Sequence, residues 1–380
     1  MENLVVIFGG QSTEHDISII SAVQAMENID RKKYKIYPVY VDKNGEWWTG
    51  KKLENIESFK DFNTKKLQKV CIVPNYQYLY KKSLHSTKII TKIDCIFNIF
   101  HGKNGEDGTM QSLFTLCKIP YTSPETLGSS VGMDKIVQKS IFKALSIDII
   151  DCFWFTKDEY YNDENKILAN KNFEYPKIVK PSSLGSSIGI NICDNENQLE
   201  EAIDLALKFD DRIIIEKALL NIKEINIALF KVGDEIIFSG LEQPKNWKHL
   251  LDFEQKYIST KSKILVGNSK VKINKKVYQK IKENAQKVYK LLDLKGVVRF
   301  DFMLDKDTKK LYLNEINTIP GSNAFYLFKE NGISYSKLID MMINEAKNNF
   351  YQKSKNQTIY ASNVLKTTKK GTKIKKWFIF

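Results

Sequence analysis

Residues 4–16 read Leu-Val-Val-Ile-Phe-Gly-Gly-Gln-Ser-Thr-Glu-His-Asp, and this stretch decides the fold class. The unbroken apolar run Leu4–Phe8 is typical of a strand that is buried on both faces. Two glycines follow, and Thr13 with Asp16 fits the pattern that caps a helix. The apolar face expected for that helix consists of Ile19, Ile20, Val23 and Met26. A strand, a glycine turn and a capped helix in this order begin an open α/β sheet.

The alternation of strands and helices continues along the chain. Strands are expected at 34–41, 94–100, 176–180, 212–216, 224–232, 235–239, 296–304 and 310–316. Helices are expected at 109–117, 135–145, 199–207 and 275–292, and a long polar loop at 241–268. The proline pair at 120 and 124 marks a domain boundary. The fold class is therefore α/β (α+β) with more than one domain.

The charge of the chain is unusual. Its 380 residues include 59 Lys+Arg and 45 Asp+Glu, a formal net charge of +14, while 42% hydrophobic residues exclude a disordered chain. Eight lysines and no acid lie in residues 351–380, so this tail carries +8 and residues 1–350 carry +6. Such a balance favours a polyanion such as nucleic acid or an anionic membrane surface. Arginine-rich and RNP-like motifs are absent, however, and we expect no nucleic-acid function.

Cysteine usage and the terminal sequence indicate a cytoplasmic protein. The five cysteines (71, 95, 117, 152 and 193) are odd in number and lack a CxxC spacing, which is typical of free thiols in a reducing compartment. The first residues lack the basic region of a signal peptide. No run of 18 apolar residues exists, so no membrane insertion is expected.

Polar side chains interrupt two neighbouring strands. Residues two apart on a strand share a face, so Arg299 and Asp301 point the same way, as do Glu315 and Asn317 on the next strand. If the strands pair, Asp301, Glu315 and Asn317 converge as oxygen ligands that suit Mg²⁺ held with phosphate oxygens. The alternative is a polar strand edge with a salt bridge. The run Asn-Glu-Ile-Asn-Thr-Ile-Pro-Gly at 314–321 favours the metal, because polar side chains on a core strand are costly unless they are used.

Two further stretches have the composition of nucleotide contacts. Lys180–Gly189 is a Ser/Gly loop whose small residues let backbone N–H groups approach phosphate oxygens, with a lysine adding positive charge. The loop lacks the Gly-Lys-Ser/Thr ending of a Walker A motif, and many such loops are plain turns. Glu216-Lys217-Ala218-Leu219 ends a strand and either binds the edge of a base or simply leaves the core.

With these stretches the chain resembles the D-alanine–D-alanine ligases, which belong to the ATP-grasp superfamily of carboxylate–amine ligases. The similarity extends over about residues 4–345 and rests on runs that occur in the family's order. These runs are Phe8-Gly-Gly-Gln-Ser-Thr-Glu-His15, His101-Gly-Lys-Asn-Gly-Glu-Asp-Gly-Thr109, Met133-Asp-Lys135, Val179-Lys-Pro-Ser-Ser-Leu-Gly-Ser-Ser-Ile-Gly189, Ile215-Glu-Lys-Ala-Leu219, Phe253-Glu-Gln-Lys-Tyr257, Arg299-Phe-Asp301 and Asn314-Glu-Ile-Asn-Thr-Ile-Pro-Gly321. Each run alone is a weak signal, whereas the ordered set is specific.

The resemblance implies a site for ATP and two Mg²⁺ (or Mn²⁺) ions. The metal ligands that it implies are Asp301, Glu315 and Asn317. The ATP contacts that it implies are Lys135 and Lys180 on the phosphates, Ser187 in a mobile loop above them, Glu216, Lys217 and Leu219 on adenine, Glu224 on the ribose, and Lys256 on the transferred phosphoryl group.

The resemblance also implies roles around the two amino-acid substrates. Glu14 accepts the ammonium of the first substrate in a hydrogen-bonded set with Ser186 and Tyr257, and His101 lies near that substrate's carboxylate. Arg299 and Gly321 stabilise the tetrahedral intermediate. In the family's chemistry ATP converts a carboxylate to an acyl phosphate, an amine attacks it, and loop closure excludes water.

One position departs from the family pattern. Five residues after Gly321 the family usually has a serine that helps to bind the carboxylate of the second substrate, and this chain has Tyr326. Either Ser322 or Asn323 takes over the role, or the second substrate differs. The expected product is D-alanyl-D-alanine for peptidoglycan, and the alternative is a ligase whose acceptor is D-lactate, D-serine or another amino acid.

The expected organisation has three domains and a tail. Residues 1–123 form an N-terminal α/β substrate domain, 124–215 a central ATP-covering domain, 216–350 the larger C-terminal catalytic domain, and 351–380 a basic tail. The resemblance suggests a homodimer. An inactive scaffold of the same fold is a further alternative, against which the intact set of lysines and metal ligands argues.

Overall fold

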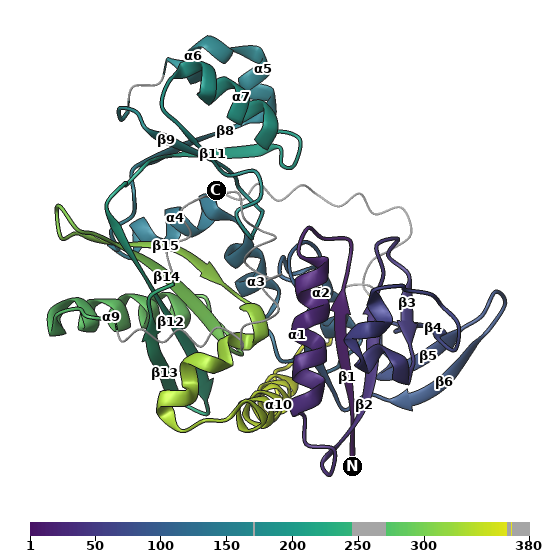
Figure 1. Cartoon of the computed structure of the whole chain (residues 1–380). Coiled ribbons are helices and arrows are strands. Elements are labelled where there is room, and N and C mark those ends of the chain that lie inside the picture. Colours follow the sequence, from purple (N-terminus) through teal and green to yellow (C-terminus); the bar gives the residue numbers. More distant parts are fainter. Residues whose placement is uncertain (170–171, 245–270, 363–365, 367–380) are drawn as a thin grey trace.

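The computed structural model of the protein describes residues 1–169, 172–244, 271–362 and 366. Within these residues there are three β-sheets, each covered by helices, and they follow one another along the chain (Figure 1). This confirms the α/β (α+β) class. The prediction of a polar loop at 241–268 is wrong at its start, because Leu241 and Glu242 belong to a strand. Residues 245–268 of the predicted loop lie outside the described residues.

The first sheet has seven strands in the order β6-β5-β4-β3-β2-β1-β7. Its parallel part consists of β1 (Glu2–Gly9), β2 (Tyr34–Val41) and β7 (Cys95–Asn98). The antiparallel strands are β3 (Trp47–Thr49), β4 (Gln68–Cys71), β5 (Tyr78–Lys82) and β6 (Thr87–Lys92). Its helical segments are α1 (His15–Asn28), η1 (Lys51–Glu54), η2 (Ile56–Phe59) and α2 (Thr109–Leu116). The polar loops after β1 and β7 therefore meet at one end of the sheet.

The start of α1 differs from the prediction. Glu14 occupies the N-cap position without a side-chain capping bond, so the capping box of Thr13 and Asp16 is wrong. Ser12 Oγ accepts the Glu14 N–H instead, at 3.1 Å, and the Glu14 carboxylate accepts a hydrogen bond from Ser186. Three of the four expected apolar side chains are buried, whereas Ile20 is 43% exposed. The loop conformation thus directs Glu14 away from its own helix.

The second sheet is antiparallel and lies at one end of the molecule (Figure 1). Its order is β10-β9-β11-β8, with β8 (Cys152–Thr156), β9 (Lys177–Pro181), β10 (Asn191–Cys193) and β11 (Arg212–Lys217). The helices α5 (Lys157–Asn162), α6 (Glu164–Leu168) and α7 (Glu196–Ala206) accompany it. Apolar side chains of α7 and β11 share one core, which leaves the polar ends of β9 and β11 free to line a site.

The third sheet is antiparallel in the order β13-β12-β14-β15. Its strands are β12 (Ile222–Val232), β13 (Glu235–Glu242), β14 (Val298–Asp305) and β15 (Leu311–Asn317). Val298, Phe300 and Phe302 of β14 are buried, so the alternate side chains face the other way. Each buried phenylalanine contributes about 2 kcal/mol of hydrophobic stabilisation. The apolar face packs on α9 (Lys275–Leu291), α3 (Thr126–Met133) and α4 (Lys135–Ala144).

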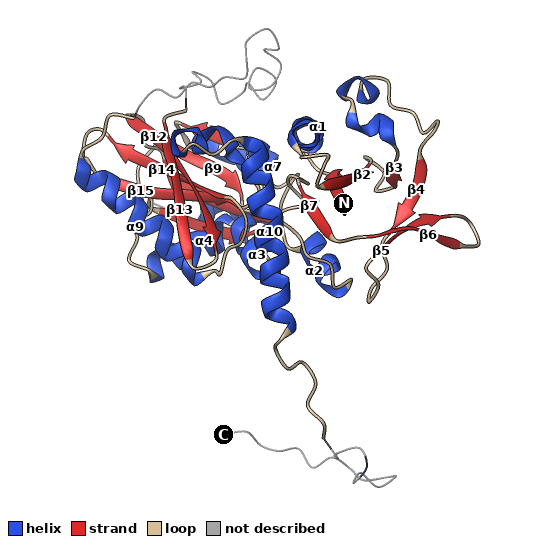
Figure 2. Ribbon diagram, turned by 90° about the horizontal axis from the view of Figure 1, so that it is seen from below, coloured by secondary structure: helices blue, strands red, loops and turns tan. Residues whose placement is uncertain are grey.

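One hydrophobic core joins the first and third sheets. It contains Phe8 of β1, Phe230 of β12, Phe328 of η3 (Gly321–Asn331) and Leu338 of α10 (Tyr335–Ser354). The C-terminal turns of α10 project beyond the other helices (Figure 2). The helix continues past residue 350, and Lys353 forms an ion pair with Glu125, whereas residues 355–362 are exposed. The domain boundaries stay predictions.

The cysteines and the helices of the described residues bear on two expectations from composition. All five cysteines lie within the described residues and are free thiols, as predicted. Among the helices of the described ranges, none combines the length and the apolar character that a membrane crossing requires.

Candidate active site

The predicted ligand strands do pair. Asp301 on β14 lies opposite Glu315 on β15, and Arg299 lies opposite Asn317. The Arg299 guanidinium donates to both oxygens of Asp301, at 2.7 and 2.8 Å, and the Asn317 amide donates to Asp301 at 2.9 Å. Burial would lower the pKa of Arg299, but Asp301 raises it well above its usual value. The expected pairing of the two strands is thus confirmed, and it places Asp301, Glu315 and Asn317 on neighbouring strands beside Arg299.

The donors in this set fit a hard cation. Two carboxylates and one amide supply oxygens, and each Asp301 oxygen has further lone pairs besides those that Arg299 and Asn317 use. The described residues contain no group of three His, Cys, Asp or Glu side chains that could hold a metal alone. Such a site suits an ion that keeps other oxygen ligands, as Mg²⁺ does with phosphates.

The row of polar side chains across one face of the third sheet, here called the polar row, is longer than the sequence predicted. Register places Asn226 of β12 opposite both Asp301 and Glu242 of β13, so Glu242, Asn226, Asp301 and Glu315 share a face across four strands. Asn226 is buried, and its position between Ile225 and Ile227 was the available signal. Glu242 accepts a hydrogen bond from the Tyr326 hydroxyl at 3.1 Å, and both groups interact electrostatically with Arg299. Tyr326 therefore belongs to the site.

A buried cluster of lysines surrounds one glutamate. Glu216 at the end of β11 is fully buried, with Lys180 Nζ 2.8 Å from one of its oxygens and Lys139 Nζ 3.0 Å from the other. Burial would raise the pKa of Glu216, but the two ammonium groups lower it to about 2. Lys139 was not predicted, although its place one helical turn after Lys135 was a usable signal. The cluster carries one net positive charge.

Lys135 connects the cluster to the polar row. Its Nζ lies 3.8 Å from Glu315 Oε2 and donates to the carbonyl of Leu184 in the Ser/Gly loop. Asp134 caps α4 by accepting the N–H groups of Ile136 and Val137, both at 3.0 Å. The same carboxylate accepts the Ser182 hydroxyl at 2.9 Å. The cap therefore fixes Lys135 and the start of the loop together.

The Ser/Gly loop bends over the end of the first sheet. Ser186 and Ser187 have positive φ, 53° and 60°. Ser186 Oγ donates to Glu14, and a side-chain Cβ at Gly185 would lie 2.9 Å from the Glu14 carboxylate, so a larger residue there would displace that carboxylate. Burial raises the pKa of Glu14, an effect that the Ser186 bond and the Lys135 charge oppose. The predicted pair of Glu14 and Ser186 is brought together, whereas Lys256 and Tyr257 lie outside the described residues.

The loop after β7 also reaches this point. His101 is buried, and burial lowers its pKa to about 4. Its ring makes a hydrogen bond to the backbone of Ile319, and Nε2 has no partner among the described residues. Glu106 accepts the N–H of Gly102 at 2.7 Å and the N–H of Ile319 at 3.0 Å. Burial and the nearby Glu14 raise the pKa of Glu106 to about 8.

The turn after β15 has open space beside Gly321. A Cβ there would meet no atom within 4 Å in the described structure. Ser322 donates its hydroxyl to Gln24 on α1, and the buried Asn323 accepts the Tyr335 hydroxyl at 3.1 Å. Both expected substitutes for the usual serine thus already have partners.

The three remaining nucleotide positions lie between the last residue of β11 and the first half of β12. Lys217 is exposed, Leu219 is half-buried after the strand end, and Glu224 is half-buried on β12. The structure leaves their assigned roles as predictions.

Comparison with known proteins identifies the family. The family model described as "D-ala D-ala ligase N-terminus" matches residues 3–124. The family model described as "D-ala D-ala ligase C-terminus" matches residues 141–344. The D-alanine–D-alanine ligase of Thermosipho melanesiensis is 40% identical over 371 residues, which are 96% of this chain and 99% of that protein. The chain belongs to the D-alanine–D-alanine ligase family.

Solved structures support the ATP-grasp fold of this family member. A D-alanine–D-alanine ligase from Helicobacter pylori has a TM-score of 0.75 at 29% identity and covers 91% of this chain and 98% of its own. The VanG D-Ala:D-Ser ligase from Enterococcus faecalis has a TM-score of 0.76 at 30% identity and covers 91% and 99%. The three-sheet architecture is therefore that of an ATP-dependent ligase.

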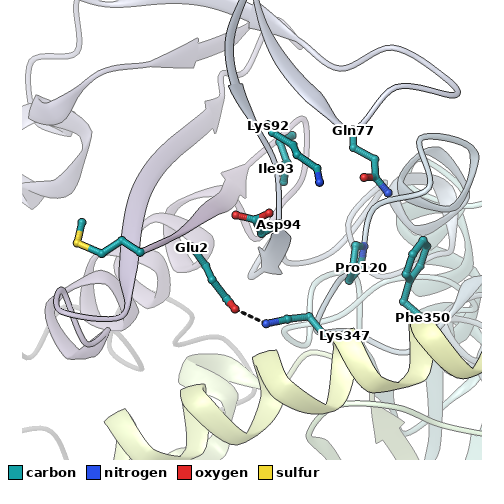
Figure 3. A pocket seen from close by; sticks show the side chains of 9 residues that line it. Glu2, Gln77, Lys92, Ile93, Asp94, Pro120, Lys347 and Phe350 are labelled. Carbon is teal, nitrogen blue, oxygen red and sulfur yellow. Dashed lines mark hydrogen bonds and ion pairs between the residues drawn. The ribbon is translucent and has the colours of Figure 1, made fainter.

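A hollow of about 400 Å³ lies elsewhere on the D-alanine–D-alanine ligase fold (Figure 3). Glu2, Asp94, Lys347 and Phe350 are among its lining residues, and an ion pair joins Glu2 to Lys347. It is at the start of β1, whereas Glu14 follows the end of β1. Ligands of open α/β sheets bind at the carboxyl ends of strands, so this hollow is not the substrate site.

Proposed function

We propose that the protein ligates two D-alanines to D-alanyl-D-alanine at the expense of ATP, for peptidoglycan synthesis. The observation that carries this proposal is the 3.8 Å approach of Lys135 Nζ to Glu315 Oε2. It joins the lysine cluster to the row of oxygen ligands, and phosphoryl transfer needs both charge neutralisation and positioning.

The nucleotide lies, in this proposal, between the second and third sheets. Lys135 and Lys180 bind the phosphates, Ser187 covers them, and Glu216, Lys217 and Leu219 contact adenine with Glu224 on the ribose. Lys180 is now bonded to Glu216 at 2.8 Å, so binding requires it to exchange this carboxylate for phosphate oxygens. Lys139 then remains as the charge that neutralises Glu216.

Asp301, Glu315 and Asn317 would bind two Mg²⁺ (or Mn²⁺) ions. When bound, these ions neutralise charge on the phosphoryl oxygens. Arg299 adds a further positive charge to those of Lys135 and Lys180, and Asp301 keeps its guanidinium oriented through two bonds.

The first amino acid binds near the ends of β1 and β7. Glu14, oriented by Ser186, accepts its ammonium, and its carboxylate lies near His101. The His101 ring donates to Ile319, so Nε2 of the neutral ring is an acceptor, and binding a carboxylate would require a second proton on the ring. A negative substrate group in this pocket favours that proton.

The chemistry then has two steps. A carboxylate oxygen of the first D-alanine attacks the γ-phosphorus of ATP and ADP leaves, which gives an acyl phosphate. The amine of the second D-alanine attacks the acyl carbon, phosphate leaves with the carbon–oxygen bonding pair, and one proton is released. Arg299 and the Gly321 N–H stabilise the oxyanion of the tetrahedral intermediate.

A different acceptor is the second candidate. Tyr326 replaces the usual serine, Ser322 and Asn323 are already bonded elsewhere, and a D-Ala:D-Ser ligase is among the similar structures. The test is phosphate release from MgATP with D-alanine alone, and with D-alanine plus D-serine or D-lactate. Turnover only with a second compound would replace the main proposal by this one.

Further proposals concern the state of the protein in the cell. We propose a cytoplasmic homodimer with the three domains 1–123, 124–215 and 216–350. Three sheets in sequence support the division, and the family supports the rest. Sedimentation of the full chain tests the dimer.

A further inference from the structure

The backbone of Ile319 is bonded on both sides by one loop of the first sheet. Glu106 Oε1 accepts the Ile319 N–H at 3.0 Å. The His101 ring makes a hydrogen bond to the Ile319 backbone. This bond raises the pKa of the histidine, so the ring is the donor and the Ile319 carbonyl the acceptor. The peptide group before Ile319 and the one after it are therefore both fixed. Glu106 and Ile319 are 213 residues apart in the chain.

The loop itself is rigid where it makes these contacts. The other Glu106 oxygen accepts the Gly102 N–H at 2.7 Å, and the Gly102 carbonyl accepts the N–H groups of Gly105 and Glu106 at 3.0 and 2.9 Å. A Cβ at Gly105 would lie 2.1 Å from the Phe100 carbonyl oxygen, so the chain folds tightly onto the end of β7. His101 and Ile319 are buried and Glu106 is half-buried, so the protein shields these contacts from much of the competing water.

The position of Ile319 is transmitted to Gly321. Pro320 lies between them with φ −64°, and its ring fixes this angle. Gly321 faces open space on one side and follows the strand that carries Glu315 and Asn317. Arg299, on the neighbouring strand, interacts electrostatically with both His101 and Glu106.

We propose that Glu106 is a positioning residue for the oxyanion-binding groups: together with His101 it fixes the peptide groups around Ile319 and thereby places the Gly321 N–H relative to Arg299. This inference rests on the proposed function, in which Gly321 and Arg299 stabilise the tetrahedral intermediate. Glu106 acts through the backbone and does not touch substrate.

The variants are Glu106→Ala, which removes both bonds, and Glu106→Gln, whose single amide oxygen retains one. The matched control is Asp107→Ala in the same loop, because within the described residues the Asp107 carboxylate accepts the N–H groups of Asn104 and Thr109, at 2.8 and 3.0 Å, and makes no hydrogen bond to Ile319. Full-length proteins are compared by kcat, by KM for ATP and D-alanine, and by affinity for a tetrahedral phosphinate analogue of the dipeptide. Hydrogen–deuterium exchange of the peptide containing residues 314–324 reports on the turn without any turnover.

A misplaced oxyanion donor should lower kcat by about 10-fold to 100-fold in Glu106→Ala, with Glu106→Gln in between. Affinity for the tetrahedral analogue should fall in parallel, while KM for ATP stays within about twofold of the wild type. Exchange in 314–324 should accelerate in both variants. Should Glu106→Ala fail to fold, the nearly isosteric Glu106→Gln carries the same test.

Several outcomes overturn the proposal. These are a kcat within about twofold of the wild type, an equal loss in Asp107→Ala, an unchanged affinity for the tetrahedral analogue, or unchanged exchange in 314–324. The failure of the proposed function looks different. A wild-type protein without D-alanine-dependent turnover would refute the ligase, whereas normal wild-type turnover with any of the outcomes above refutes only the role of Glu106.

Discussion

Lys135, at the first position of α4, lies with its Nζ 3.8 Å from Oε2 of Glu315 on β15. The two residues belong to segments that are far apart in the chain. Their approach brings the lysine cluster of α4, β9 and β11 to the polar face of the third sheet. Phosphate oxygens bound here would meet lysines on one side and the proposed metal ligands on the other.

Asp301→Asn should lower kcat and raise the Mg²⁺ concentration that the reaction requires. The variant removes the carboxylate that both orients Arg299 and lies opposite Glu315, so we expect kcat to fall by about 100-fold and the required Mg²⁺ concentration to rise at least about 10-fold. The measurement is phosphate release over a Mg²⁺ titration. Asp305→Asn is the control, because Asp305 is on the same strand and the hydrogen bonds that its carboxylate accepts from described residues all lie within its hairpin turn. Similar losses in the two variants would contradict the assignment.

Lys139→Met should destabilise the fold and weaken ATP binding. Lys139 and Glu216 are 3% and 0% exposed, and breaking a buried pair by removing one partner costs about 3–5 kcal/mol. Among the described residues, Lys180 would then be the ammonium left to neutralise Glu216, so we expect KM for ATP to rise about 10-fold. Urea unfolding and initial rates measure the two effects. The exposed Lys143→Met, one turn further along α4, should change neither, and equal behaviour of the two variants would refute the role of Lys139.

Tyr326→Phe should affect the second amino acid and not ATP. The hydroxyl donates to Glu242 at 3.1 Å beside Arg299, and its removal leaves that carboxylate without this donor. We expect KM for the acceptor to rise about 5-fold to 10-fold with KM for ATP unchanged. Tyr312→Phe on β15 is the control. A change in KM for ATP alone would place Tyr326 at the nucleotide instead.

Stability should depend on pH through Glu106. Burial and the neighbouring Glu14 raise the pKa of Glu106 from 4.5 to about 8, against the opposing effects of the Gly102 and Ile319 N–H groups and of Arg299. Between these pH values the unfolded chain has released the proton that the native state retains, so the free energy of unfolding falls as pH rises, by at most about 1.4 kcal/mol per unit. Glu106→Gln lacks this group. Its stability relative to the wild type should therefore increase from pH 5 to about 8 and then level off. Parallel profiles in urea denaturation would contradict the raised pKa.

Period-2 alternation made the polar face of β14 and β15 predictable. It placed Arg299 with Asp301 and Glu315 with Asn317 on shared faces, and the register of β14 with β15 brought the two pairs together. The apolar run at 4–8 also lies within a buried strand, β1, and β2 has the expected bounds. The short strands β3 to β6 were missed, because sequences such as Thr-Lys-Ile-Ile-Thr-Lys in β6 are largely exposed and lack alternation.

Contacts between distant segments set the limit of prediction. The sequence assigned no role to Glu106 in the run 101–109, since the N–H that it accepts belongs to Ile319, 213 residues away. Lys139 depends on the fold of β11, and Asn226 on the register of β12. The capping box failed because Ser12 satisfies the N–H of Glu14 while the Glu14 carboxylate turns to Ser186, a competition that local sequence does not encode.

The most direct measurement is MgATP-dependent phosphate release with D-alanine as the only amino acid, combined with mass-spectrometric detection of the product. The account predicts one phosphate per molecule of D-alanyl-D-alanine, and no release with L-alanine. Phosphate release that does not depend on D-alanine, or the absence of the dipeptide when D-alanine is present, would contradict it.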